Sequence, residues 1–288
     1  MPRKTLYDLY LMKQKGDKVA WITAYDAPTA ALAEAAGMDM LLVGDSLGMC
    51  VSGLPGTVPV TMEECLHHTR AVRAGAPNTF VIGDMPFLSY QVSVEEAVRN
   101  AGRFLKEAGA DAIKLEGGQR VTRQIRAIAD AGIVVFGHIG LTPQSSGQLG
   151  GFKAQGRTLE AAQLVLADAL AVQEAGAHFL LVEAVSPEVM RLIHQRLRIP
   201  VYGIGAGPHA DGQLLIVSDM LGLFQAFTPR FVKKYANLAE EMKRAFTAYR
   251  DEVKQGIFPG PEHVYPMLEG EAERLAKAEG EGGAAEGE

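Results

Sequence analysis

The sequence predicts an α/β protein, a (β/α)8 barrel with extra helices at both ends of the chain. Eight short apolar segments alternate with helical segments, and a parallel strand that is covered on both faces reads as such an apolar run. Several helical segments end in Ala-Gly shortly before the next apolar run, which is typical of strand–helix repeats with right-handed crossovers. An open doubly wound sheet is the alternative, because strand counts read from sequence err by about one or two strands.

The predicted elements follow one another in a regular order. A helix over residues 5–15 opens the chain, since Leu6, Leu9 and Tyr10 recur at helical spacing. The predicted strands cover residues 19–23, 40–44, 79–83, 112–115, 133–137, 179–182, 201–204 and 214–217. The predicted helices cover residues 27–36, 62–74, 94–108, 121–131, 158–175 and 187–195, with a short helical turn before the last strand. A helical region over residues 228–258 is expected to pack outside the barrel.

One domain over residues 1–266 and an acidic tail over residues 267–288 are predicted. A chain of 288 residues, 48% of them hydrophobic, can bury a sizeable core. Of the formal charge of −6, residues 269–288 carry −5. The end of the tail has too few apolar residues to fold, so we expect disorder there, with a short helix around residues 271–278.

Composition limits the binding partners and the cellular compartment that we expect. The rest of the chain is close to neutral and has no basic stripe, so no nucleic-acid partner is expected. No apolar run resembles a signal peptide or approaches the roughly 18 residues of a membrane span, so no membrane association is expected. Cys50 and Cys65 form no disulfide framework or zinc motif, which indicates a reducing, cytoplasmic location.

Five of the apolar segments end in polar or ionisable side chains. These side chains are Asp45 and Ser46, Asp84, Lys114 and Glu116, His138, and Glu183. A helix cap or a turn is the structural alternative for a single one of them. Charges at five strand ends predict instead a shared polar site at the rim of the barrel, where the strands converge.

Asp45 and Asp84 are candidate ligands of a divalent cation. Carboxylates at the ends of neighbouring strands suit a hard cation, and the lack of nearby cysteines and paired histidines argues against zinc. Magnesium tolerates few protein ligands, because waters and the substrate complete its octahedron, and manganese is the alternative.

Four further strand-end residues have candidate roles in binding and catalysis. Lys114 and Glu116 share one face of their strand and would point into the barrel, either as a structural ion pair or to neutralise substrate and reach metal-bound water. His138 is a donor to a substrate oxygen or a structural histidine. Glu183 follows four apolar residues and is a candidate general base, or it pairs with a neighbouring base.

Residues 140–156 form a long segment directly after His138 and show little helical or strand periodicity. Structureless loops of this length are uncommon in compact domains and are usually functional, so we expect a lid over the site, with a floppy insertion as the alternative. The glycine-rich residues 203–208 lack the third glycine of a dinucleotide fingerprint and are expected to let the backbone approach a ligand.

Short motifs in a fixed order connect the chain to a known family. They are Thr23-Ala24-Tyr25-Asp26, residues 42–49, His68 with Ala76-Pro77, residues 114–118, residues 137–144, Gln155-Gly156-Arg157, residues 203–207 and Asp211-Gly212-Gln213. Together they resemble the ketopantoate hydroxymethyltransferase family over residues 5–266, with the acidic tail as an addition. The ordered set is far more specific than any single motif.

The resemblance implies a TIM barrel of the phosphoenolpyruvate/pyruvate type and a one-carbon transferase. The implied reaction moves a hydroxymethyl group from 5,10-methylenetetrahydrofolate to 3-methyl-2-oxobutanoate through a magnesium-stabilised enolate. It gives 2-dehydropantoate, on the route to pantothenate. The resemblance also implies one magnesium ion in each subunit, a cytoplasmic location and a homodecamer.

The resemblance further implies roles for individual residues. Asp45 and Asp84 would bind the metal directly and Glu116 would support it. The implied substrate-binding residues are Asp45, Ser46, Asp84, Lys114 and His138. Glu183 would be the catalytic proton acceptor.

Two other functions stay open at this point. A magnesium-dependent carbon–carbon lyase or mutase of the same barrel superfamily, acting on a 2-oxo or 2-hydroxy acid, would use the same residues. Such lyases often carry a reactive cysteine in an active-site loop, whereas residues 140–156 contain none. A non-catalytic keto-acid-binding protein would bind the acid without turnover.

Overall fold

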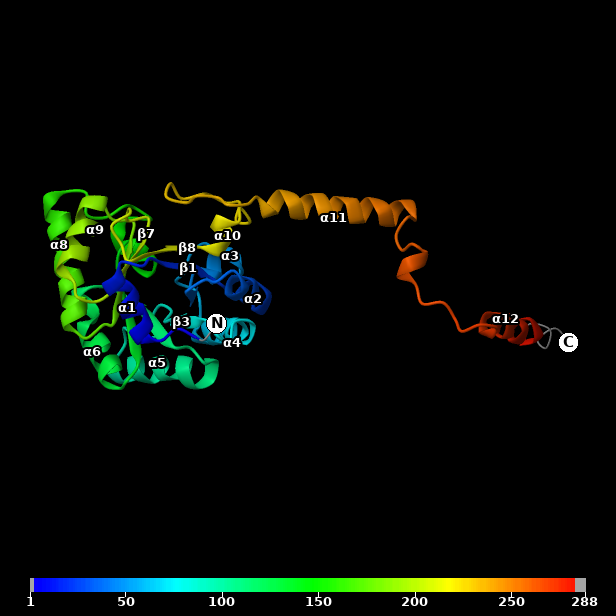
Figure 1. The fold of residues 1–288 in the computed structure, drawn as a ribbon, viewed down its shortest axis with the longest axis horizontal. Coiled ribbons are helices and arrows are strands. Elements are labelled where there is room, and N and C mark those ends of the chain that lie inside the picture. The colour runs from blue at the N-terminus through cyan, green and yellow to red at the C-terminus, as the bar shows by residue number, and fades with distance from the viewer. Residues whose placement is uncertain (1–2, 283–288) are drawn as a thin grey trace. The chain divides into compact units, whose positions relative to one another are not determined.

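The computed structural model describes residues 3–282 and confirms a closed barrel of parallel strands (Figure 1). The strands are β1 Val19–Thr23, β2 Met40–Val43, β3 Phe80–Asp84, β4 Ala112–Glu116, β5 Val134–Gly140, β6 Phe179–Glu183, β7 Val201–Ile204 and β8 Gly212–Leu215. Each strand pairs with the next along the chain, and β8 closes on β1, with Trp21 opposite Leu214. This closure rules out the open doubly wound sheet.

Helices connect most of the strands, and their buried faces pack on outward-facing strand residues in one apolar cluster. They are α1 Leu6–Lys15, α2 Ala27–Ala35, α3 Leu47–Cys50, α4 Met62–Gly75, α5 Val94–Ala108, η1 Gln119–Val121, α6 Thr122–Asp130, η2 Pro143–Ser145, α7 Ser146–Leu149, α8 Leu159–Glu174, α9 Pro187–Arg196 and α10 Val217–Met220. Capping boxes at Thr5 and Thr61 begin α1 and α4, and Gly109, with φ 70°, ends α5 as the Ala-Gly pattern indicates. Within residues 3–282 no helix has the length and hydropathy to cross a membrane.

The structure corrects three details near the strand ends. The helical turn predicted before the last strand is wrong, since no helix lies between β7 and β8 in the described chain and α10 follows β8 instead. Strand β8 begins at Gly212, earlier than predicted, because Gly212 pairs with Val19 of β1. Strand β5 continues through His138 to Gly140, because its last residues pair with the end of β6.

Aromatic side chains fill the barrel interior below the rim. Phe136 stacks on Phe179 with ring centroids 4.4 Å apart, and Trp21 meets Tyr202 edge-on at 5.4 Å. Phe136 lies two residues before His138 on the same strand, so the aromatic layer lies directly beneath the charged positions. The charged side chains therefore stand on a packed aromatic floor.

The chain divides into two compact units, Met1–Ala236 and Asn237–Glu288. The second unit contains α11 Leu238–Gln255, η3 Pro261–His263 and α12 Glu271–Gly282. This division falls before the predicted domain boundary at residue 266. Helix α12 covers the short helix predicted around residues 271–278, whereas residues 283–288 of the tail lie outside the described part of the chain.

Asp211, just before β8, connects three elements of the barrel. Its carboxylate accepts hydrogen bonds from Lys13 Nζ of α1 (2.8 Å), His194 Nε2 of α9 (2.7 Å) and the backbone N–H of Val201 in β7 (2.8 Å). Burial alone would raise the pKa of Asp211, but these donors outweigh it and hold the pKa below 3.8. The ionised carboxylate therefore stabilises the fold.

We expect Asp211→Asn to lower the free energy of unfolding by about 1.5–3 kcal/mol at pH 7, because two charge-assisted contacts are lost. The folded state takes up the Asp211 proton only at a lower pH than the unfolded state does. The wild-type protein therefore loses this contribution as the pH falls below about 3.8, and the two proteins converge. Denaturant unfolding at pH 7 and pH 3 measures this, with the exposed Asp17→Asn as control. A difference that does not shrink between pH 7 and pH 3 would contradict the assignment.

Candidate active site

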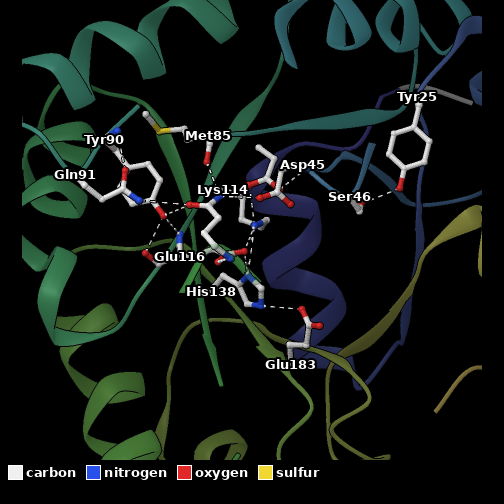
Figure 2. A network of polar contacts seen from close by, with 12 residues as sticks. Tyr25, Asp45, Ser46, Met85, Tyr90, Gln91, Lys114, Glu116, His138 and Glu183 are labelled. Carbon is white, nitrogen blue, oxygen red and sulfur yellow. Dashed lines mark hydrogen bonds and ion pairs between the residues drawn. The ribbon is translucent and has the colours of Figure 1, made fainter. Parts of the chain in front are cut away.

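The predicted site residues converge at the carboxyl ends of β2 to β6 (Figure 2). Asp45 follows β2, Asp84 ends β3, Lys114 and Glu116 lie on β4, His138 lies on β5 and Glu183 ends β6. Strand register aligns them in pairs, since Asp84 is opposite Lys114 and Glu116 is opposite His138. The rim site predicted from the strand ends is therefore present as a geometric cluster.

Lys114 lies at the centre of the cluster and is buried. Its Nζ is 2.7 Å from Asp84 Oδ1, 3.4 Å from Glu116 Oε1 and 3.3 Å from His138 Nδ1. Burial by itself would lower the pKa of Lys114, but the three carboxylates Asp84, Glu116 and Asp45 outweigh it and raise the pKa. Lys114 is therefore a permanent cation in a site that water does not screen.

His138 connects the cluster to Glu183. Its Nδ1 lies 3.3 Å from Glu116 Oε1, and its Nε2 lies 3.2 Å from Glu183 Oε2. Burial and the neighbouring Lys114 would lower the pKa of His138, but the contacts with Glu116 and Glu183 outweigh both and raise the pKa to about 9. A protonated His138 thus holds the Glu183 carboxylate by charge as well as by contact.

Asp45 and Asp84 are adjacent, and burial dominates the pKa of both carboxyl groups. The backbone N–H of Asp45 donates to Asp84 Oδ2 at 2.9 Å. Burial raises the pKa of Asp45 well above its ordinary value, and repulsion from Asp84 and Glu116 raises it further. Burial also raises the pKa of Asp84, although Lys114 opposes this. Asp45 does not cap α3, so the capping alternative does not explain it.

Glu116 is the best-compensated carboxylate of the cluster. Burial would raise its pKa, but Lys114, His138 and the backbone N–H of Gln144 (3.0 Å) outweigh burial and lower it. Its ionised oxygens are therefore already occupied by protein donors. Within this cluster Glu116 supports its neighbours more than it offers a free ligand.

The residues offer a hard divalent cation a suitable donor set, although not a complete cage. Within residues 3–282 no group of three or more histidine, cysteine, aspartate or glutamate side chains converges as a ready metal cluster. Asp45 and Asp84 are adjacent residues with carboxylate oxygens in the cavity, and burial is the main cause of the raised pKa of each. A cation that keeps several of its waters fits such a pair.

Ser46 lines the same cavity, but its hydroxyl makes a separate contact. Its Oγ lies 2.8 Å from the hydroxyl of Tyr25, and Figure 2 shows this pair apart from the Lys114 cluster. Of the predicted site residues, Ser46 is thus at the edge of the arrangement.

Gln144 and Tyr90 hold the cluster together, and sequence reasoning assigned them no role. Gln144 Nε2 donates to Asp45 Oδ2 (2.8 Å) and to the backbone oxygen of Met85 (3.0 Å). The Tyr90 hydroxyl donates to Gln144 Oε1 at 2.7 Å and accepts from the backbone N–H of Glu116 at 3.1 Å. Gln144 could have been noticed because it is a polar residue that follows Pro143, soon after His138. No sequence pattern marks Tyr90.

Residues 140–156 are more ordered than the sequence predicts. They contain η2 and α7, and Gln155 forms a bridge with Val185. Leu141, Pro143, Phe152 and Ala154 of this segment line the cavity above the cluster, whose volume is about 520 Å³. The floppy-insertion alternative is therefore not supported, and closure over the site stays a prediction.

The glycines of residues 203–208 pack against protein side chains. A Cβ on Gly205 would lie 2.5 Å from the ring of Phe231, and one on Gly207 would lie 2.9 Å from Pro187. Both positions also have positive φ angles. The expectation that these two glycines admit a ligand is therefore wrong, because neighbouring side chains occupy that space.

Comparison with known proteins identifies the family. A family model described as ketopantoate hydroxymethyltransferase matches residues 3–261. The chain belongs to this family. A 3-methyl-2-oxobutanoate hydroxymethyltransferase from Alkaliphilus metalliredigens is 65% identical over 271 residues, 94% of this chain and 96% of that protein. One from Moorella thermoacetica is 56% identical over 263 residues, 91% of this chain and 98% of that protein.

The fold of this ketopantoate hydroxymethyltransferase family member is similar to that of solved structures with low sequence identity. The solved structure of 2,3-dimethylmalate lyase, a PEP mutase/isocitrate lyase superfamily member, matches with a TM-score of 0.58 and 17% identity, covering 95% of this chain and 98% of that chain. Identity this low shows the fold alone, and it confirms the predicted type of barrel. The relatives confirm the predicted family and the transferase class.

Gln144→Met keeps the size of the side chain but removes the donor to Asp45 and Met85. We expect the free energy of unfolding to fall by about 1–3 kcal/mol, because buried acceptors lose their partner. Guanidinium unfolding measures the loss. Gln148→Met, an exposed position in the same loop, is the control and should change stability by less than about 0.5 kcal/mol. Equal effects in the two variants would refute a bridging role for Gln144.

Proposed function

We propose that this protein transfers a hydroxymethyl group from 5,10-methylenetetrahydrofolate to 3-methyl-2-oxobutanoate, giving 2-dehydropantoate for pantothenate synthesis. The observation that carries the proposal is 65% identity, over 94% of the chain, to a relative named for this transfer. The cluster at the rim supplies acid–base and cationic groups that suit it.

The keto acid is an anion, and we assign its recognition to Lys114 together with Asp45, Ser46, Asp84 and His138. Lys114 offsets the substrate carboxylate in a site where few waters can do so. His138 supplies a further donor from a buried position. The aromatic floor beneath them keeps the acid at the rim.

Asp45 and Asp84 would hold the magnesium ion, with Glu116 in support. When bound, this ion polarises the 2-oxo group of the substrate and eases loss of the neighbouring proton. The adjacency of the two carboxylates and their raised pKa values support the assignment. Gln144 would keep Asp45 oriented through its 2.8 Å hydrogen bond.

Glu183 is the proposed base that removes the C3 proton of the keto acid. Its Oε2 lies 3.2 Å from His138 Nε2, and this contact holds the carboxylate at the end of β6, beside the cluster. The C3 carbon of the resulting enolate then bonds to the methylene carbon of the folate. Both carbon–nitrogen bonds of the bridging methylene break, and water supplies the hydroxyl. The two folate nitrogens gain the proton removed from C3 and one proton from water, so that tetrahydrofolate leaves. The protein orients the two substrates, and residues 140–156 would close over them.

The lyase and the binding-protein alternatives are not favoured. The superfamily lyase resembles the chain at 17% identity, against 50% or more for relatives that carry the transferase name. A pure binding protein would have no use for a carboxylate held by His138 beside a buried lysine.

We also infer a cytoplasmic homo-oligomer, a homodecamer by family resemblance. The two cysteines are free, in keeping with a reducing compartment. Helix α11 buries no side chain within its unit, and Met242, Phe246, Tyr249 and Val253 recur at helical spacing as an exposed apolar stripe. A stripe of this kind supports association. We also propose that the acidic tail after residue 266 is solvated.

Glu183→Gln should slow hydrogen–deuterium exchange at C3 of 3-methyl-2-oxobutanoate by about 100-fold or more, because the amide cannot accept the proton. NMR in deuterated water with magnesium measures the exchange. The control is Glu188→Gln, an exposed residue of α9 that should exchange at the wild-type rate. Exchange at the wild-type rate in Glu183→Gln would remove Glu183 as the base. Product formation by wild-type protein without methylenetetrahydrofolate would sink the transferase proposal.

A further inference from the structure

The cavity above the cluster is larger than the keto acid needs. Its volume of about 520 Å³ lies in the range of pockets that hold drug-sized ligands, whereas the keto acid has only five carbons. Phe224, Phe227 and Phe231, which follow α10, line this cavity together with Met49 and Phe152. Aromatic walls of this kind suit a flat ring system.

The aromatic segment is fixed to the barrel at several points. The backbone N–H groups of Leu223 and Phe224 donate to Ser218 O in α10, at 2.8 and 3.1 Å. Phe231 packs directly against Gly205, at the end of β7, where a Cβ would not fit. These contacts make the aromatic wall a built feature of the rim.

Asp219 of α10 also lines this cavity. Asp219 is only 5% exposed. Within residues 3–282 its side chain has no hydrogen-bond or ion-pair partner. Burial raises the pKa of Asp219 to about 6, with Lys234 opposing the rise. A buried carboxylate without a partner is costly, so a ligand with hydrogen-bond donors would stabilise it.

The chemistry of the two substrates decides which of them Asp219 can recognise. The keto acid carries a carboxylate and a ketone, which both accept hydrogen bonds. The Asp219 carboxylate can donate none, and it repels the negative charge of the keto acid. The pterin ring of a reduced folate is flat and presents two adjacent donors on one edge, the N3–H and the 2-amino group. Two parallel N–H···O bonds to one carboxylate are a strong, directional pairing.

We propose that Asp219 binds the pterin edge of the folate co-substrate, with the ring against the aromatic wall of Phe224 and Phe231. The proposal rests on the proposed function and adds to it the site that reads the second substrate. Arg230 lies exposed at the mouth of the same cavity, and no ion pair engages it in the described chain. Its charge complements the carboxylates of the folate tail.

Asp219→Asn tests the site, because it replaces one acceptor by a donor that opposes the pterin. We expect the Kd for tetrahydrofolate, measured by calorimetry, and the KM for methylenetetrahydrofolate to rise at least about tenfold. Exchange at C3 of the keto acid without folate should stay at the wild-type rate. Asp130→Asn, outside the cavity, is the matched control and should change none of these quantities.

A folate analogue with a methyl group in place of the 2-amino group tests the same pairing on the wild-type protein. We expect wild-type protein to bind tetrahydrofolate about tenfold more tightly than the analogue, and Asp219→Asn to discriminate far less. Equal discrimination by the two proteins would overturn the proposal, as would an unchanged Kd in Asp219→Asn. So would a parallel loss of C3 exchange, which would assign Asp219 to the keto-acid site or to folding.

These outcomes separate the proposal from the function on which it rests. If wild-type protein forms product from folate and keto acid while Asp219→Asn binds tetrahydrofolate normally, the transferase stands and Asp219 is not its pterin site. If wild-type protein forms no product in the presence of both substrates and magnesium, the transferase itself fails.

Discussion

The buried Lys114 ammonium, held between carboxylates, is the interaction on which the rest of the site depends. It contacts Asp84 and Glu116 directly and lies beside His138, all inside a barrel whose floor is aromatic. Charges in such surroundings are costly unless neighbours compensate them. Four carboxylates, Asp45, Asp84, Glu116 and Glu183, share the rim with only two basic side chains, Lys114 and His138, which is why we propose a cation there.

Strand register and supporting hydrogen bonds place the charged side chains of the cluster. Parallel pairing places Asp84 opposite Lys114 and Glu116 opposite His138, so that each charge has its partner on the next strand. Gln144 and Tyr90 then fix the two ends of the cluster by hydrogen bonds to Asp45 and Glu116. The rim thus carries a charged cluster, to which we assign the keto acid, and the same cavity has aromatic side chains and Asp219, to which we assign the folate.

Much of the fold and the charged cluster could be predicted from the sequence, because both depend on local patterns. Apolar runs that end in charges predict strands and a shared rim, and the structure brings Asp45, Asp84, Lys114, Glu116, His138 and Glu183 together there. Gln144, Tyr90 and Asp219 could not be assigned, because their roles arise from tertiary contacts between loops distant in sequence. The extension of β5 and the start of β8 depend likewise on pairing with β6 and β1, which no local pattern encodes.

We propose that the excess of carboxylates at the rim binds a divalent cation. The most direct test is the melting temperature of the wild-type protein with magnesium chloride against potassium chloride at equal ionic strength. Magnesium at about 100 times its Kd should stabilise the protein by roughly 2.7 kcal/mol, seen as a clear rise in Tm that potassium does not produce. Equal melting temperatures in the two salts would contradict the account.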